Sequence, residues 1–233
     1  MNKNSDTIII YGGGSSLNDI TESEYNHFKK FDSIAVNLFI KTKIHLTHYI
    51  LGEGLLFLLH KIETETDNNL KSEYQNEYNN YIQILNNDYS DTQIIFIGQY
   101  LIMEFLNKYI DIIKNDISND NIIFVKCNNI CNNSVDLIKN NILHHNNCGI
   151  NCCINYALRM GYNNIIFVGI DLYNSKYAYN SINSKILNKN EKEQHSTKNS
   201  IFEYILLLKD KINFFSYNPQ SLLTEIIPIY NID

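Results

Sequence analysis

The feature that most constrains the fold is a short apolar run at residues 7–11 that ends in three consecutive glycines. The run reads TIIIY, which is typical of a buried strand, and Gly12, Gly13 and Gly14 predict a turn directly after it. A helical pattern follows, and a second strand is predicted at residues 33–37. A strand, a turn, a helix and a strand in this order form a βαβ unit, which predicts a parallel sheet with helices on its faces.

The rest of the chain continues the alternation of strands and helices. Further strands are predicted at residues 44–51, 93–97, 121–125, 164–169 and 211–216, and helices at residues 18–30, 73–85, 101–113, 149–160 and 200–209. Asn18 or Asp19 is expected to cap the first helix. The predicted fold class is α/β, a Rossmann-like, mostly parallel sheet with helices on both faces, in a single domain over residues 1–233.

Residues 171–199 interrupt this alternation with a long polar stretch that has little apolar periodicity. Loops of this length inside compact domains are usually lids or binding loops. We therefore expect residues 171–199 to form a lid over the site.

The glycine turn is the first candidate for a binding site, since glycines let the backbone approach a phosphate while the next helix supplies positive partial charge. Ser15 and Ser16 follow the glycines without the last glycine of the dinucleotide fingerprint, and Asp32 precedes the second strand instead of following it. This pattern disfavours NAD. Asn37 at the end of the second strand can hydrogen-bond a ribose or a base. A tight turn that binds no ligand remains the alternative.

Two further segments carry polar groups that suit group transfer. Asp171, Tyr173 and Tyr177 follow the strand at residues 164–169, and ligands of open α/β sheets bind outside the carboxyl ends of strands. Tyrosine hydroxyls can donate hydrogen bonds to a departing phosphate, and no acidic D-x-D pair is present to hold a metal. His195 lies in the polar stretch and has a side chain suited to general-base catalysis, although a solvated surface histidine is the alternative.

Composition excludes several classes of protein. A formal charge of −6 and a single arginine leave no basic stripe, which argues against nucleic acid as a partner. No stretch reaches the roughly 18 apolar residues that a membrane span needs, so we expect no integral membrane segment and a cytoplasmic location. The five cysteines lack paired C-x-x-C spacing and are expected to be buried thiols. A metal site formed by His144, His145, Cys148 and Cys152 is the less favoured alternative.

Taken together, these segments resemble one known family, the bacterial lipo-oligosaccharide sialyltransferases of glycosyltransferase family 42. The resemblance runs through IIIYGGGSSLNDI, FDSIAVNLF, CGINCCINYALRMGYNNIIFVGIDLYNSKYAY, HSTKN and NPQSLL. It implies an inverting, metal-independent transfer of sialic acid from CMP-sialic acid to a glycan hydroxyl, with no cofactor. It also implies lipo-oligosaccharide as the acceptor, homo-oligomers, and a location peripheral to the inner membrane, although the family's membrane-associating extension has no counterpart after NPQSLL.

The resemblance also assigns roles to residues by position. It makes His195 the general base and places Tyr173 and Tyr177 at the leaving phosphate. It assigns donor binding to Gly12, Gly13, Gly14, Ser15, Ser16, Asn37, His145, Asn147, Cys148, Gly149 and Asp171.

Several donor-site positions depart from the family pattern. Gly13 stands where the family has Asn, Leu38 where it has Gln, Cys148 where it has Ser, and His145 where it has Arg. Losing donors around an anionic sugar favours an altered donor sugar or a decayed enzyme. A catalytically silent nucleotide- or sugar-binding protein is therefore the alternative, and a pterin pyrophosphokinase-like enzyme, which would need Mg²⁺ and ATP, is a third reading.

Overall fold

The structure is a computed structural model that describes residues 3–36, 39, 42, 44–52, 54–118, 122–128, 142–144, 148–172 and 191–232. Side chains are described for these residues except 98–107, 124, 126–128, 142–144 and 191–197.

The described strands form one eight-stranded sheet in the order β6-β5-β4-β3-β2-β1-β7-β8. Every neighbouring pair in this order is parallel, which confirms the predicted parallel sheet. The strands are β1 Thr7–Tyr11, β2 Asp32–Val36, β3 His48–Leu51, β4 Gln93–Gln99, β5 Ile122–Asn128, β6 Ile142–His144, β7 Asn164–Val168 and β8 Asn213–Ser216. Alternate residues of the central strands are buried on opposite faces, as in β1, where Ile8 and Ile10 join one core cluster and Ile9 joins the other.

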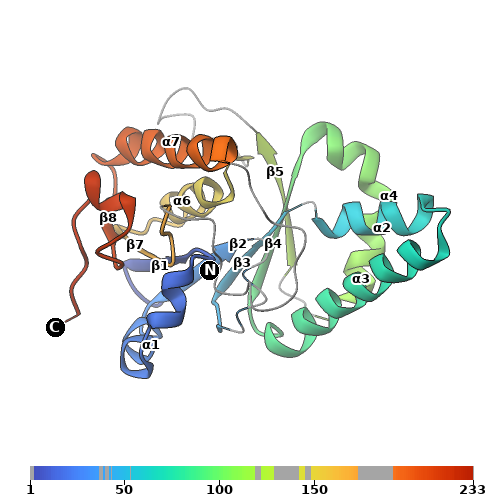
Figure 1. Cartoon of the computed structure of the whole chain (residues 1–233), viewed down its shortest axis with the longest axis horizontal. Helices are drawn as coiled ribbons and strands as arrows, with labels where there is room; N and C mark the ends of the chain where they lie inside the picture. Colours follow the sequence, from blue (N-terminus) through green and yellow to red (C-terminus); the bar gives the residue numbers. More distant parts are fainter. Residues whose placement is uncertain are drawn as a thin grey trace.

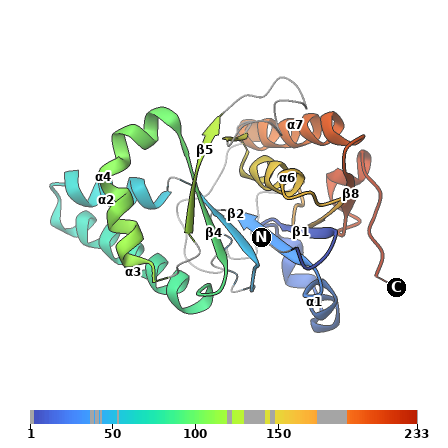
Figure 2. The same cartoon turned by 180° about the vertical axis from the view of Figure 1, so that it is seen from behind.

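Helices cover both faces of the sheet, as predicted (Figure 1). The described α-helices are α1 Glu22–Phe28, α2 Gly54–Thr64, α3 Asn68–Asp88, α4 Tyr100–Asp116, α6 Gly149–Arg159 and α7 Glu191–Leu208. Side chains of α6 and α7 belong to one core cluster, and side chains of α1, α2, α3 and α4 belong to the other. The reverse view shows the same division, with α7 stacked outside α6 and α1 on the opposite side (Figure 2).

The first helix begins later than either predicted cap. Residues Ser15–Asp19 form a short 3₁₀ helix, η1, and α1 starts only at Glu22. Thr21 caps α1 through a capping box with Glu24, in which each side chain bonds the other residue's backbone. Asn18 and Asp19 are therefore not the caps, because the chain turns once more before the helix begins.

Two helices differ from the sequence prediction. Residues 54–64 were assigned no element, yet they form α2, whose Leu55, Leu56 and Leu59 are buried against the sheet. Residues 191–199 were predicted to belong to a long loop, yet they form the first half of α7. The physical reason lies in good helix formers and acids at the start of α7, where the helix dipole favours negative charge. Residues 173–190 lie outside the described part of the chain.

None of the helices in the described ranges is both long enough and apolar enough to cross a bilayer.

Candidate functional site

The strand order identifies one edge of the sheet where a ligand site is expected. The chain leaves β1 toward β2, whereas β7 returns to the opposite side of β1 and pairs with it directly. This reversal is the topological switch point, and open parallel sheets bind ligands at the carboxyl ends of the strands that flank it. In this protein those ends are Tyr11, followed by the glycine turn, and Val168, followed by Gly169.

The glycine turn packs directly against the turn that follows β7. The Gly12 amide donates to the Val168 carbonyl at 2.8 Å, and the Gly14 amide donates to the Gly169 carbonyl at 2.7 Å. A Cβ atom on Gly12 would lie 2.4 Å from the Gly169 carbonyl oxygen, so no side chain fits there. The glycines at positions 12 and 14 thus serve the close approach of two backbone turns, while the Gly13 amide donates to no other described backbone group.

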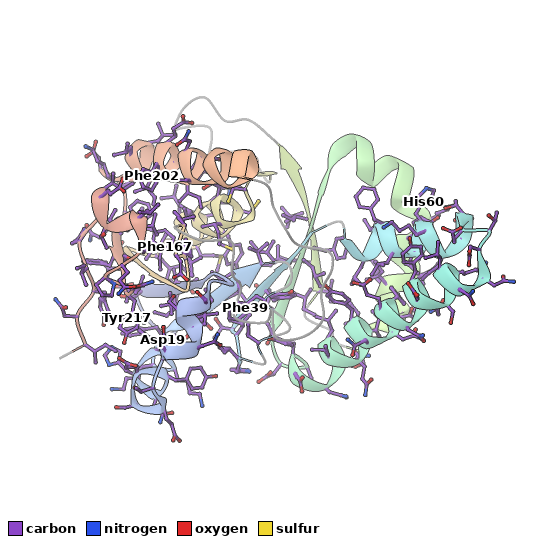
Figure 3. The ribbon with its side chains drawn as sticks, in the orientation of Figure 1. Asp19, Phe39, His60, Phe167, Phe202 and Tyr217 are labelled. Atoms are coloured by element: carbon purple, nitrogen blue, oxygen red, sulfur yellow. The ribbon has the colours of Figure 1, made fainter. Side chains whose placement is uncertain are left out.

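An aromatic pair anchors the chain where β1 enters this turn. Tyr11 is 2% exposed, and its ring stacks on Phe39 with 5.4 Å between the ring centroids. Phe39 is labelled in Figure 3. Burial raises the pKa of the Tyr11 hydroxyl well above its ordinary value, so this phenol stays protonated at physiological pH.

Asp171 joins the glycine turn to the end of β7. Its carboxylate accepts the Ser16 amide at 3.0 Å, a short hydrogen bond from the Ser16 hydroxyl, and the Asn218 side-chain amide at 2.9 Å. Only 3% of Asp171 is exposed. Of the predicted donor-binding residues, the glycine turn, Ser15, Ser16 and Asp171 are therefore brought together at the switch point.

Helix α6 directs its N-terminus toward the same edge of the sheet. The helix ends at Arg159 and the chain then enters β7 at its amino end, so Cys148 and Gly149 at the other end of α6 face the carboxyl edge. The first amides of a helix carry positive partial charge and suit an anionic ligand. Cys148 is the N-cap residue of α6 and is 7% exposed.

Contacts from α6 and from the C-terminal segment hold the helix that carries His195. The Asn151 side-chain amide of α6 donates to the Ser200 hydroxyl of α7 at 3.0 Å. Lys198 of α7 lies 3.4 Å from the Glu225 carboxylate of the 3₁₀ helix η3 (Leu222–Glu225). His195 is thus a residue of α7, which corrects its predicted place in a loop. Its side chain lies outside the described part of the structure.

Other predicted site residues also lie outside the described residues: Asn37, His145, Asn147, Tyr173 and Tyr177. The alternative metal site includes His145 and the undescribed side chain of His144. Where the structure describes side chains, no three metal-ligating residues converge. Cys148, Cys152 and Cys153 are buried and form no disulfide, which confirms the prediction of buried thiols for these three.

A second polar cluster lies at the opposite, amino edge of the sheet. Asp32 at the start of β2 is 2% exposed and accepts hydrogen bonds from Asn4 and from the Tyr162 hydroxyl. His48 at the start of β3 shares a 2.8 Å hydrogen bond with the Thr47 hydroxyl. Burial lowers the pKa of His48. Asp32 lies at the amino edge, opposite the switch point, and its carboxylate already accepts hydrogen bonds from Asn4 and Tyr162. It is therefore not placed to bind a ribose at the switch point.

Asn218 was missed as a site residue. The sequence NPQSLL predicts a turn, and an Asn before Pro is an ordinary turn signal. Nothing local distinguishes Asn218 from the other asparagines of the chain, because its partner Asp171 is 47 residues away.

Comparison with known proteins supports the fold. No protein-family model matches this sequence, and no curated protein matches it. Among solved structures, the sialyltransferase CstII from Campylobacter jejuni, in complex with a substrate analogue, cytidine-5'-monophosphate, is similar to this chain with a TM-score of 0.50 and 16% sequence identity. The alignment covers 97% of this chain and 85% of that chain. At this identity the likeness shows a common α/β Rossmann-like fold.

Proposed function

We propose that this protein is a sialyltransferase-like glycosyltransferase that moves sialic acid, or a related sugar, from a CMP-activated donor to a glycan hydroxyl. The observation that carries the proposal is the switch point between β1 and β7, where the glycine turn, Asp171 and the N-terminus of α6 meet one edge of the sheet. The likeness in fold to a sialyltransferase bound to CMP supports a nucleotide ligand at this edge.

The proposed binding step uses backbone groups and small side chains. The glycine turn lets a nucleotide approach closely, and the N-terminal amides of α6 at Gly149 are placed to favour an anionic phosphate. Asn37, His145, Asn147 and Cys148 complete the proposed donor pocket.

The proposed chemistry is a metal-independent, inverting displacement at the anomeric carbon, with no cofactor. His195 takes the proton of the acceptor hydroxyl as that oxygen attacks, and the glycosidic bond to the CMP phosphate breaks. Tyr173 and Tyr177 donate hydrogen bonds to the departing phosphate as its charge develops. The acceptor is a glycan such as lipo-oligosaccharide, and the enzyme works as a homo-oligomer at the cytoplasmic side of the inner membrane.

Departures from the family pattern in the donor pocket favour a second candidate, a catalytically silent nucleotide- or sugar-binding protein. Gly13, Leu38, Cys148 and His145 stand where the family has Asn, Gln, Ser and Arg. Losing these polar groups around an anionic sugar would weaken catalysis more than it weakens nucleotide binding. Binding without transfer is the behaviour expected of this candidate.

The test is calorimetric titration with CMP, UMP and AMP, followed by hydrolysis of CMP-sialic acid in the presence of EDTA. The proposed transferase binds CMP in preference to the other nucleotides and releases CMP from the sugar donor without a divalent metal. His195→Ala is expected to abolish turnover while CMP affinity stays nearly unchanged, because the base contacts the acceptor and not the nucleotide.

His45→Ala provides the matched control, since His45 is exposed and lies before β3, away from the carboxyl edge. This variant is expected to retain full turnover. CMP binding without hydrolysis or transfer would favour the silent protein. Absence of CMP binding in the folded wild-type chain would refute the transferase, and a folded chain that binds none of CMP, UMP, AMP and CMP-sialic acid would refute both candidates.

A further inference from the structure

The segment that follows β8 runs beside the turn that follows β7. The Tyr217 amide donates to the Phe167 carbonyl at 2.9 Å, and the side chains of both residues lie on the β8 side of the molecule (Figure 3). Further on, the Ser221 hydroxyl donates to the Ile170 carbonyl at 2.6 Å, and the Leu222 amide donates to the Asp171 carbonyl at 3.2 Å. Residues 217–222 therefore follow the backbone of the β7 turn along its length.

The side chain of Asn218 is held from both of its polar ends. Its Oδ1 atom accepts the Gln220 amide at 2.9 Å, and its Nδ2 atom donates to Asp171 Oδ1 at 2.9 Å. The Ser216 hydroxyl also donates to the Asn218 carbonyl at 3.1 Å. Because Oδ1 is occupied by a donor, the amide group presents its NH₂ group to Asp171 in one orientation.

The carboxylate that Asn218 holds lies directly on the glycine turn. A Cβ atom on Gly14 would fall 2.5 Å from Asp171 Oδ2, and the same carboxylate accepts both the amide and the hydroxyl of Ser16. Any rotation of the Asp171 side chain would therefore displace the backbone of residues 14–16. The position of the glycine turn thus depends on the orientation of one buried carboxylate.

The backbone beside this carboxylate is strained. Leu172 has a φ of 63°, in the left-handed region that a leucine rarely adopts. Such strain persists only where surrounding contacts over-determine the conformation, and here Ser221 and Leu222 bond the carbonyls of the two preceding residues. Tyr173, which follows Leu172 in the sequence, is one of the two tyrosines proposed to bind the leaving phosphate.

We propose that Asn218 is a positioning residue of the donor site, which acts through Asp171 to hold Ser16 and the glycine turn in the orientation that accepts the nucleotide. This inference rests on the proposed function, because it assigns the turn to nucleotide binding. Asn218 itself does not contact the donor. Its contribution is to fix the carboxylate that fixes the turn.

The test compares Asn218→Ala with Asn213→Ala in the full chain, using CMP as the probe. Asn213 is exposed and bonds Asn164 at the opposite edge of the sheet, so its variant is expected to bind CMP as the wild type does. Asn218→Ala is expected to bind CMP about tenfold more weakly, because a hydrogen bond to a charged group is lost. Asp171→Asn is expected to weaken binding too, and the double variant is expected to be no weaker than the weaker single variant, since both act through one contact.

Asn218→Asp supplies a readout that a general loss of stability would not produce. It places a second carboxylate against Asp171. In the wild type, the polar groups that the described residues direct at the Asp171 carboxylate are the uncharged ones of Ser16 and Asn218, so in the variant only those of Ser16 remain beside the two carboxylates. Repulsion between the two carboxylates disfavours the state in which both are charged. Measured relative to wild type at each pH, CMP affinity is expected to approach the wild-type value in acid, where the pair shares a proton, and to fall as the pH rises.

The outcomes separate this inference from the proposed function. A folded wild-type chain that does not bind CMP would overturn the proposed function and the inference with it. A wild-type chain that binds CMP, with Asn218→Ala binding as tightly as Asn213→Ala, would overturn only the inference. Far-UV circular dichroism establishes folding of each variant, and if Asn218→Ala fails to fold, a flat pH profile for Asn218→Asp overturns the inference on its own.

Discussion

Gly12→Ala is expected to lower the free energy of unfolding by about 2–4 kcal/mol. The added Cβ would lie 2.4 Å from the Gly169 carbonyl oxygen and 2.6 Å from Ile170 Cγ1. Ordinary contacts at such a position begin at 3.4 Å, so the two turns would have to separate by about 1 Å (3.4 minus 2.4). The backbone of both turns is tied into the sheet, which leaves no flexible side-chain end to absorb this shift.

The magnitude follows from two contributions. Inserting a methyl group into a packed site typically costs about 1–3 kcal/mol. A separation of about 1 Å would also stretch the hydrogen bond from the Gly12 amide to the Val168 carbonyl from 2.8 Å beyond bonding range, which costs about 1 kcal/mol more.

The assay is urea unfolding followed by far-UV circular dichroism and by tyrosine fluorescence, since the chain has 17 tyrosines and no tryptophan. Two other glycines serve as matched controls. Gly161 has a φ of +74° but open space at its Cβ, so Gly161→Ala is expected to cost about 1–2 kcal/mol through backbone strain alone. Gly54 has nothing within 4 Å of its Cβ and starts α2, so Gly54→Ala is expected to be neutral or slightly stabilising.

The test compares the loss of unfolding free energy in the three variants, which is expected to be largest for Gly12→Ala and smallest for Gly54→Ala. If Gly12→Ala destabilises the chain no more than Gly161→Ala, with the same dependence on urea concentration, the close approach of the two turns is not what requires glycine there. The 2.4 Å approach at Gly12 would then not limit stability, whatever the effect on nucleotide binding.

Three further predictions concern the core and the amino edge of the sheet. Burial lowers the pKa of His48, so just below the ordinary histidine pKa of about 6.5 the unfolded chain binds more protons than the folded chain. The free energy of unfolding should therefore fall as the pH drops through that value. In urea titrations His48→Gln should show a shallower fall. Cys152 and Cys153 are fully buried, and burial raises the pKa of the Cys153 thiol, so site-resolved mass spectrometry should find both unalkylated by iodoacetamide until the chain unfolds. Tyr162→Phe removes a 2.8 Å hydrogen bond to buried Asp32 and should cost about 1–3 kcal/mol in the same urea assay; no loss would show that the bond adds nothing to stability.

The sheet was largely predictable because its signals are local. A central strand of a parallel sheet is buried on both faces, and in residues 7–11 the three consecutive isoleucines and Tyr11 are all buried. Such a run is visible in the sequence without knowledge of its partner strands. The helix at residues 149–160 was recognised for a similar reason, and α6 is buried between the sheet and α7. Helix α2 was missed because its start at Gly54 lacks a strong local signal, and its leucines acquire meaning only against the sheet.

The candidate site also has a part that local sequence signals predict and a part that only the tertiary structure reveals. Glycines directly after the first strand predict a close backbone approach, because only glycine leaves room for one. The glycines do not reveal which segment they approach. That segment is the turn after β7, which also binds Asn218 through Asp171. Residues so far apart in sequence meet only when β7 inserts beside β1 and β8 follows it, so no local pattern could reveal the contact. The chain's order of strands and glycines therefore specifies the kind of fold and the edge that matters, whereas the packing of three distant segments decides which side chains shape that edge.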